Sequence, residues 1–209
     1  MLKRSVLALL AISFALTAAA KGGNVSTEWG VTAGIRYNGI SLYDVPSGFS
    51  VWPGITYNAG VQAGVIFGMV AVQPELNYGY TTLKVLCPQS DYLPKTSVKC
   101  HEIEIPLLLS LHMLDYLRIN AGPVFNIMSR TNYYSGEESM MYGNLHPTFG
   151  YAAGLTFCIS GKFIIDARFT GYLNRTLNEF NPYTPGTSGD AITFRSKSWS
   201  GGIKIGYLF

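Results

Sequence analysis

The sequence predicts an all-β fold: an eight-stranded antiparallel transmembrane up-and-down β-barrel with short periplasmic turns and long extracellular loops. Three observations predict it. Apolar and polar residues alternate in strand-length segments, the connections between segments alternate between short and long, and the C-terminal segment ends on an aromatic residue. These features are typical of outer-membrane barrels, whose strands face lipid on one side and a polar interior on the other.

The C-terminal segment, residues 199–209, carries the clearest pattern. Successive side chains of a strand point to opposite faces. Its odd positions, such as Trp199, Ile203 and Tyr207, are mostly apolar or aromatic up to Phe209, whereas most even positions are small, polar or cationic, such as Lys204. We therefore expect the odd face to contact lipid.

Seven further segments repeat this alternation over about 9 to 13 residues each, the length that a tilted strand needs to cross a membrane. In chain order, their apolar faces are represented by Val31 and Ile35, Val61 and Val65, Leu76 and Tyr78, Leu107 and Leu109, Ile119 and Phe125, Leu155 and Phe157, and Ile165 and Phe169. The segments are 28–38, 57–67, 70–80, 102–112, 117–127, 149–159 and 163–174.

The connections alternate in length. Gly68-Met69 is suited to a type II′ turn, and residues 113–115 and 160–162 are comparably short. The long connections are rich in Ser, Asn, Gly, Pro and Tyr, and span about 41–54, 85–97, 130–146 and 175–195. Short periplasmic turns and long extracellular loops produce this arrangement in outer-membrane barrels, and it places both chain ends on the periplasmic side.

The amino terminus predicts export. Lys3 and Arg4 precede an apolar stretch from Val6 to Leu16, and small residues follow up to Ala20. This is the layout of a cleavable signal peptide, residues 1–20, which leaves 21–209 as one outer-membrane β-barrel domain. Beyond it no apolar run is long enough for a transmembrane helix. The alternative, a retained membrane helix, fits the short apolar run less well.

Composition narrows the function classes. The chain is 48% hydrophobic and 13% charged, with a net charge of +3 that falls to +1 when the two signal-peptide cations are removed. A nearly neutral protein offers no electrostatic basis for nucleic-acid binding. No phosphate-binding glycine loop opens a helix, and the Cys and His spacing fits no zinc pattern, so we expect no cofactor and no metal.

The polar faces carry charges of both signs, and in a narrow barrel these must pair because they are buried. We expect one lumen charge network, with Asp166 contacting neighbours of Arg168 rather than Arg168 itself. A soluble β-sandwich, in which these charges would be solvated, is the alternative architecture. The network residues are Arg36, Glu75, Glu102, Glu104, Arg118, Asp166, Arg168 and Lys204.

Six short motifs resemble those of the PorT-like family of outer-membrane β-barrel proteins, with matching order and spacing from residue 73 to the end. The resemblance implies an integral outer-membrane barrel without an assigned reaction, some members being linked to protein secretion. The motifs are Gln73-Pro74-Glu75-Leu76, Glu104-Ile105-Pro106-Leu107-Leu108, Asn120-Ala121-Gly122-Pro123, the run from Phe149 to Gly154, Ile165-Asp166-Ala167-Arg168 and the run from Ile205 to Phe209.

Cys87 and Cys100 depart from that family pattern. They flank the second long loop in an oxidising compartment, so a disulfide is expected there, with two unpaired thiols as the alternative. Cys158 is expected to be a small buried hydrophobic residue near a periplasmic turn.

We expect a non-enzymatic monomer with a structural or binding role at the cell surface or as a partner of a secretion apparatus. Its partners would be outer-membrane lipid and a protein bound through the extracellular loops, whose aromatic residues are Tyr133, Tyr134, Tyr142, Phe180 and Tyr183. The alternative is an outer-leaflet lipid hydrolase (deacylase). It would use His101 as base and Ser129 as nucleophile, brought diagonally close on the lipid-facing surface at the outer rim.

Overall fold

A computed structural model describes residues 25–87, 95–135, 138–141, 148–180 and 192–209. For 128–135, 138–141 and 179–180 it describes the backbone alone. The predicted signal peptide, residues 1–20, lies outside the described residues. Among the residues described, no helix is long and apolar enough to cross a membrane.

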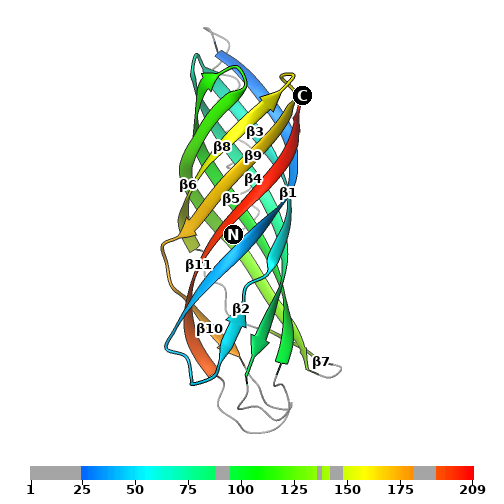
Figure 1. Cartoon of the computed structure of the whole chain (residues 1–209), viewed down its shortest axis with the longest axis vertical. Helices are drawn as coiled ribbons and strands as arrows, with labels where there is room; N and C mark the ends of the chain where they lie inside the picture. The colour runs from blue at the N-terminus through cyan, green and yellow to red at the C-terminus, as the bar shows by residue number, and fades with distance from the viewer. Residues whose placement is uncertain (1–24, 88–94, 136–137, 142–147, 181–191) are drawn as a thin grey trace.

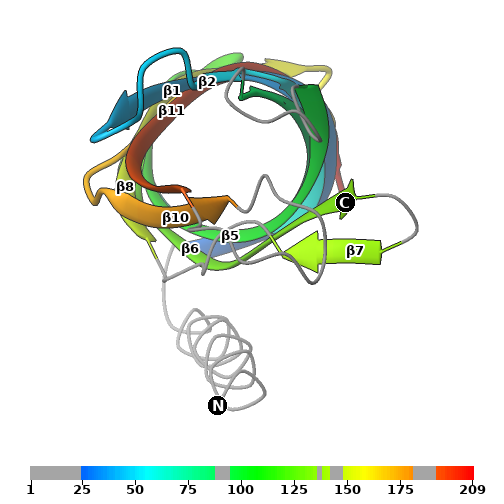
Figure 2. The ribbon, with the colours of Figure 1, turned by 90° about the horizontal axis from the view of Figure 1, so that it is seen from below.

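The chain forms a closed barrel of eight antiparallel strands, and Figure 2 shows the ring end-on. The first and last strands close it through a continuous register from Gly30 opposite Leu208 to Tyr43 opposite Arg195. The ring strands, in order, are β1 (Val25–Tyr43), β3 (Ile55–Phe67), β4 (Val70–Leu86), β5 (Lys95–Leu114), β6 (Leu117–Ser135), β8 (Thr148–Ile159), β9 (Phe163–Tyr172) and β11 (Ile192–Leu208). The predicted fold class is therefore confirmed.

Three short strands extend the rim at the end of the barrel that carries the long connections. β2 (Ser50–Trp52) pairs with β4, β7 (Glu138–Met141) with β6, and β10 (Thr176–Phe180) with β11. The opposite end, at the top of Figure 1, carries the tight turns and the C-terminus. There Gly68 has φ of 62°, and Ser160 and Gly161 have φ of 53° and 71°. A single positive φ fits the predicted type II′ turn, and two successive ones fit a type I′ turn.

The strands run further than the sequence pattern predicts. β5, for example, spans 20 residues, whereas about 9–11 suffice to cross a bilayer. Parts of every segment predicted as a long loop are strand: β4 continues to Leu86, β6 to Ser135, and β11 begins at Ile192. The barrel therefore continues well beyond the membrane on the extracellular side.

The polarity of the strand faces inverts along this extension. On β4 the buried, inward positions are Glu75, Asn77 and Thr81, and then apolar Leu83 and Val85. The outward positions change from apolar residues to Lys84 at the same level. The inward apolar side chains form a cluster in the barrel mouth, where Phe49 and Phe194 pack with ring centroids 4.9 Å apart. We call it the mouth cluster: Phe49, Val51, Leu83, Val85, Cys87, Val98 and Phe194.

A β-bulge interrupts the pairing of β5 with β6. Ile103 lies opposite Met128, but Glu104 lies opposite Asn126, so Ile127 is the extra residue. A bulge of one residue exchanges the two faces of the strand beyond it. Beyond Ile127 the pairing of β6 with β5 is therefore shifted by one residue.

Candidate functional site

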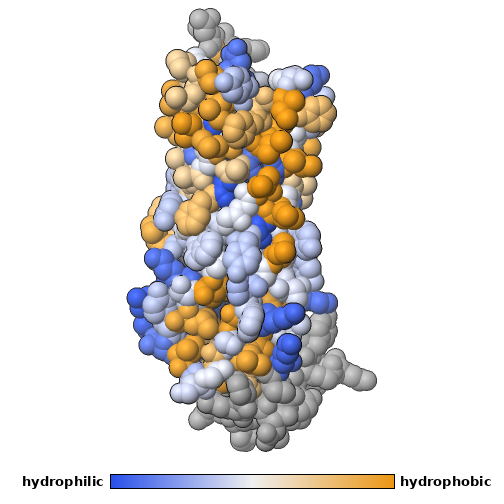
Figure 3. Space-filling view, in the orientation of Figure 1, coloured by the Kyte–Doolittle hydropathy of each residue, from blue (hydrophilic) through white to orange (hydrophobic). Residues whose placement is uncertain are grey.

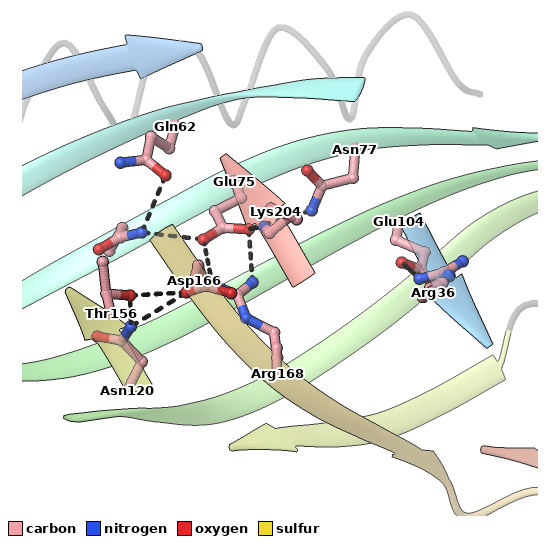
Figure 4. A network of polar contacts seen from close by, with 11 residues as sticks. Arg36, Gln62, Glu75, Asn77, Glu104, Asn120, Thr156, Asp166, Arg168 and Lys204 are labelled. Atoms are coloured by element: carbon pink, nitrogen blue, oxygen red, sulfur yellow. Dashed lines mark hydrogen bonds and ion pairs between the residues drawn. The ribbon is translucent and has the colours of Figure 1, made fainter. Parts of the chain in front are cut away.

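The lumen is filled by charged and polar side chains in three layers. In the middle layer, Glu75 of β4 is 3% exposed and accepts hydrogen bonds from Arg168 of β9 at 2.7 and 2.9 Å. Lys204 of β11 donates to the same carboxylate at 2.9 Å (Figure 4). Gln73 and Asn77 also donate to it, so this buried carboxylate has a complete set of donors.

Asp166 belongs to the same layer. It accepts from Thr156 at 2.7 Å and from Arg168 at 2.9 Å. The expectation that Asp166 avoids Arg168 was wrong. Residues i and i+2 of a strand share a face, and the arginine side chain is long enough to fold back onto its neighbour while its other terminal nitrogen contacts Glu75.

The layer nearest the extracellular side is built on Arg36 of β1. Its two terminal guanidinium nitrogens contact different carboxylates, Glu102 and Glu104 of β5. The Tyr172 hydroxyl of β9 donates a hydrogen bond to Glu104. Sequence reasoning missed Tyr172, although its position on β9 has the same parity as Asp166 and Arg168 and so already marked it as inward.

The periplasmic layer is an ion pair between Arg118 of β6 and Glu28 of β1, at 2.5 Å. Glu28 has the same parity on β1 as the inward Arg36, but the predicted network did not include it. The structure thus brings the predicted lumen residues together in three separate layers, each with its own ion pairs, rather than in one continuous network.

A glycine lies across the strand pair from several of these charged residues. Gly202 pairs with Arg36 and Gly79 with Glu102. A Cβ atom at Gly202 would lie 2.4 Å from Cβ of Arg36, and one at Gly79 would lie 2.7 Å from Oε1 of Glu102. Both distances are too short for non-bonded atoms, so these glycines leave the space that the charged side chains occupy.

Two of the ion pairs in this lumen join strands on opposite walls. Counting round the ring, β4 and β9 are four strands apart, and so are β1 and β6, which in a ring of eight is the full diameter. The pairs Glu75–Arg168 and Glu28–Arg118 therefore cross the interior. Two of the spaces between the described residues are a cavity of about 30 Å³ beside Lys204 and one of about 130 Å³ between Arg36 and the mouth cluster.

The register does not support the disulfide predicted between Cys87 and Cys100. Cys100 lies opposite Thr81, six residues before Cys87. At about 3.3 Å per residue this separates the two cysteines by roughly 20 Å along β4. A disulfide needs Cα atoms within about 7 Å, so the prediction was wrong. The prediction assumed that a loop spans residues 85–97. In the structure β4 continues to Leu86 and β5 already begins at Lys95, so Cys100 lies well inside a strand.

The proposed His–Ser pair is also separated by the register. Ser129 lies opposite Glu102, whereas His101 lies opposite Arg130, because the bulge at Ile127 shifts the pairing of β6 by one residue. The His101 ring instead shares a hydrogen bond of 2.6 Å between its Nδ1 and the Tyr78 hydroxyl, and packs on Tyr80. The expected loop aromatics Tyr133, Tyr134, Tyr142, Phe180 and Tyr183 have side chains outside the described residues.

No group of three or more His, Cys, Asp or Glu side chains that could hold a metal ion occurs in the part of the chain that the structure describes. Cys158 is buried with Ile164 and Leu208 in a small apolar cluster at the turn end of the lumen. The site is thus made of ion pairs and hydrogen bonds between the walls of the barrel.

A closed eight-stranded barrel with an apolar outer belt and a charged interior defines an integral protein of the bacterial outer membrane. The chain belongs to the outer membrane protein beta-barrel domain family, which it matches over residues 24–209. A search of curated proteins finds no match.

Solved structures of outer-membrane barrels are similar in fold. OprG from Pseudomonas aeruginosa gives a TM-score of 0.53 at 12% identity, covering 90% of this chain and 98% of that chain. Outer membrane protein AlkL in DMPC bilayers gives 0.52 at 8% identity, covering 90% and 93%. Ail of Yersinia pestis, in complex with the heparin analogue sucrose octasulfate, gives 0.50 at 12% identity, covering 88% and 99%. At these identities the likeness concerns the fold alone.

Proposed function

We propose that this protein is a non-conducting, non-enzymatic outer-membrane barrel with a structural or binding role at the cell surface. The observation that carries the proposal is the pairing of opposite barrel walls through the lumen by Glu75–Arg168 and Glu28–Arg118. An eight-stranded barrel is only wide enough for side chains to fill it. What such a barrel presents to its surroundings is its outer face and its extracellular rim.

The motif resemblance to the PorT-like family supports a more specific form of this role, as a partner of a protein secretion apparatus. For such a partner role the long strands are the relevant feature, because they hold the extracellular rim and its loops above the membrane. Loops on a rigid scaffold commonly carry the binding residues of a protein. Photo-crosslinking in cells from Ser188, in the connection that precedes β11, tests it. A discrete adduct that is absent when the crosslinker replaces lipid-facing Leu109 supports a protein partner. No adduct from Ser188 contradicts the binding role.

The lipid hydrolase alternative has less support. A histidine base must reach the proton of its serine within hydrogen-bond distance. The register places His101 and Ser129 at non-matching positions of β5 and β6, and His101 contacts Tyr78 instead. Unchanged lipid acylation in strains carrying His101→Ala or Ser129→Ala would agree with a non-enzymatic protein, whereas a change in both strains would favour the hydrolase.

The filled lumen predicts negligible conductance. Purified protein in planar bilayers should give no stable single-channel currents, because ions cannot pass layers in which charged side chains already contact one another. As a comparison, the combined variant Glu75→Ala/Arg168→Ala/Lys204→Ala removes the middle layer and should increase the frequency of current events. Large, steady currents from the unmodified protein would contradict the proposal.

A further inference from the structure

We propose that basic side chains on the outer face of the barrel bind the phosphate groups of lipid A, the phosphorylated glycolipid of the outer leaflet. The inference takes one element from the proposed function: the orientation of the barrel, which has its tight turns in the periplasm. The residues that carry it are Lys84 of β4, Lys99 of β5, and Arg195 and Lys197 of β11, all exposed. We call them the rim cations.

The rim cations begin where the apolar belt ends. On β11 the outward positions run through Tyr207, Ile205 and Ile203 to Trp199, and the next two outward positions are Lys197 and Arg195. A strand tilted by about 40° climbs roughly 2.5 Å per residue. The two cations therefore lie about 5 and 10 Å beyond Trp199, which is the depth of the headgroup region.

On β4 and β5, which lie on the other side of β1 from β11, basic residues also follow the last outward aromatic residues. On β4 the outward aromatic residues Tyr78 and Tyr80 precede Lys84 by a few residues. On β5 Lys99 lies opposite Thr82, two residues beyond His101. Figure 3 shows the change on one face of the molecule: orange side chains predominate near the C-terminal end, and blue ones become frequent below the middle. The cations thus lie at one level on separate strands.

Charge is segregated between the two faces of the barrel wall. The carboxylates of Glu28, Glu75, Glu102, Glu104 and Asp166 all make ion pairs inside the lumen. Of the remaining carboxylates whose side chains the structure describes, Asp115 lies at a periplasmic turn and Asp44 at the extracellular rim. Among the side chains that the structure describes, the outer face of the extracellular rim is therefore mainly positive.

Three of the four rim cations, Lys84, Arg195 and Lys197, form no ion pair with a carboxylate whose side chain the structure describes. Trp52 lies opposite Lys84 and is exposed, and Arg175 stacks on Tyr43, with 4.1 Å between the guanidinium carbon and the ring centroid. Cations beside exposed aromatic rings fit a ligand that carries phosphate on a sugar, because phosphate accepts charge-assisted hydrogen bonds and the ring covers the sugar face.

The test measures binding of bis-phosphorylated lipid A to the purified barrel in detergent, by native mass spectrometry, beside the same lipid without phosphates. The unmodified protein should retain the phosphorylated lipid preferentially, and the preference should fall with added salt. Because each basic residue near an anionic lipid surface contributes about 1 kcal/mol, the variant Lys84→Gln/Lys99→Gln/Arg195→Gln/Lys197→Gln should bind at least tenfold more weakly. All four residues are exposed, so the variant should fold, which a heat-modifiable gel shift verifies.

Lys162→Gln is the matched control, since Lys162 is an exposed cation at a periplasmic turn. It should bind lipid A as the unmodified protein does. Equal retention of the two lipids, or unchanged affinity in the fourfold variant, would overturn the proposal. So would equally tight binding of soluble inositol hexakisphosphate, because the site would then recognise phosphate without the lipid. None of these outcomes bears on conductance, so the proposed function is tested separately.

Discussion

Replacing Glu75 with glutamine is expected to lower the free energy of unfolding by about 3–5 kcal/mol, the usual cost of removing one partner from a buried ion pair. Glu75 is the carboxylate on which Arg168 and Lys204 converge. Without it both cations stay buried with Asp166 as the remaining carboxylate of the layer. Denaturant titration in phospholipid vesicles, followed by tryptophan fluorescence, measures the loss.

Two variants make this result specific. Asp44→Asn removes an exposed carboxylate at the rim and should change the free energy of unfolding by less than about 0.5 kcal/mol. The double variant Glu75→Gln/Lys204→Met removes one charge of each sign and should recover part of the stability. If Glu75→Gln were as stable as the unmodified protein, the middle layer would not hold the walls together. The double variant still gives a measurement if the single variant does not fold.

Replacing Leu109 with arginine is expected to cost about 2–4 kcal/mol, the cost of a cation on the lipid face near the bilayer midplane. Leu109 is 57% exposed and lies on β5 between Val72 of β4 and Ala121 of β6. On a water-exposed surface the same substitution would be nearly neutral. Folding yield in vesicles and the free energy of unfolding both report the effect.

Leu177→Arg is the matched control. Leu177 of β10 is 52% exposed, but it lies opposite Arg195 at the extracellular rim, beyond the apolar belt. Its replacement should cost about 0–1 kcal/mol, as found near the membrane interface. Equal costs at the two positions would mean that the belt around Leu109 does not face lipid.

The sequence pattern predicted the eight ring strands and their antiparallel order because apolar and polar positions alternate regularly inside the membrane. It did not predict where the strands end. Beyond Thr81 of β4 the alternation continues with the two faces exchanged, so Leu83 and Val85 point inward and Lys84 outward. A search for one constant apolar face therefore stops at that point and assigns the remainder to a loop.

The candidate site was partly predictable for a similar reason. The parity of each strand identified the inward charges, but contacts between them depend on side-chain length and on register. Arg168 reaches Asp166 on its own strand, and the bulge at Ile127 moves Ser129 to the position opposite Glu102. The sequence around Ile127 contains no glycine that would mark the bulge, so the error could not be avoided by pattern alone.

The exchange of faces on β4 fixes how deep the barrel sits in the bilayer. If the barrel moved inward by a few residues, Lys84 and its counterparts would enter hydrocarbon, at a cost that rises from about 0–1 kcal/mol at the interface toward 2–4 kcal/mol per cation at the midplane. If it moved outward, Leu76 and its neighbours would meet water at about 25 cal/mol for each Å² exposed. Because movement in either direction costs free energy, the residue pattern of the strands fixes the depth of the barrel in the bilayer. The extracellular rim is thereby held at a constant height above the lipid surface.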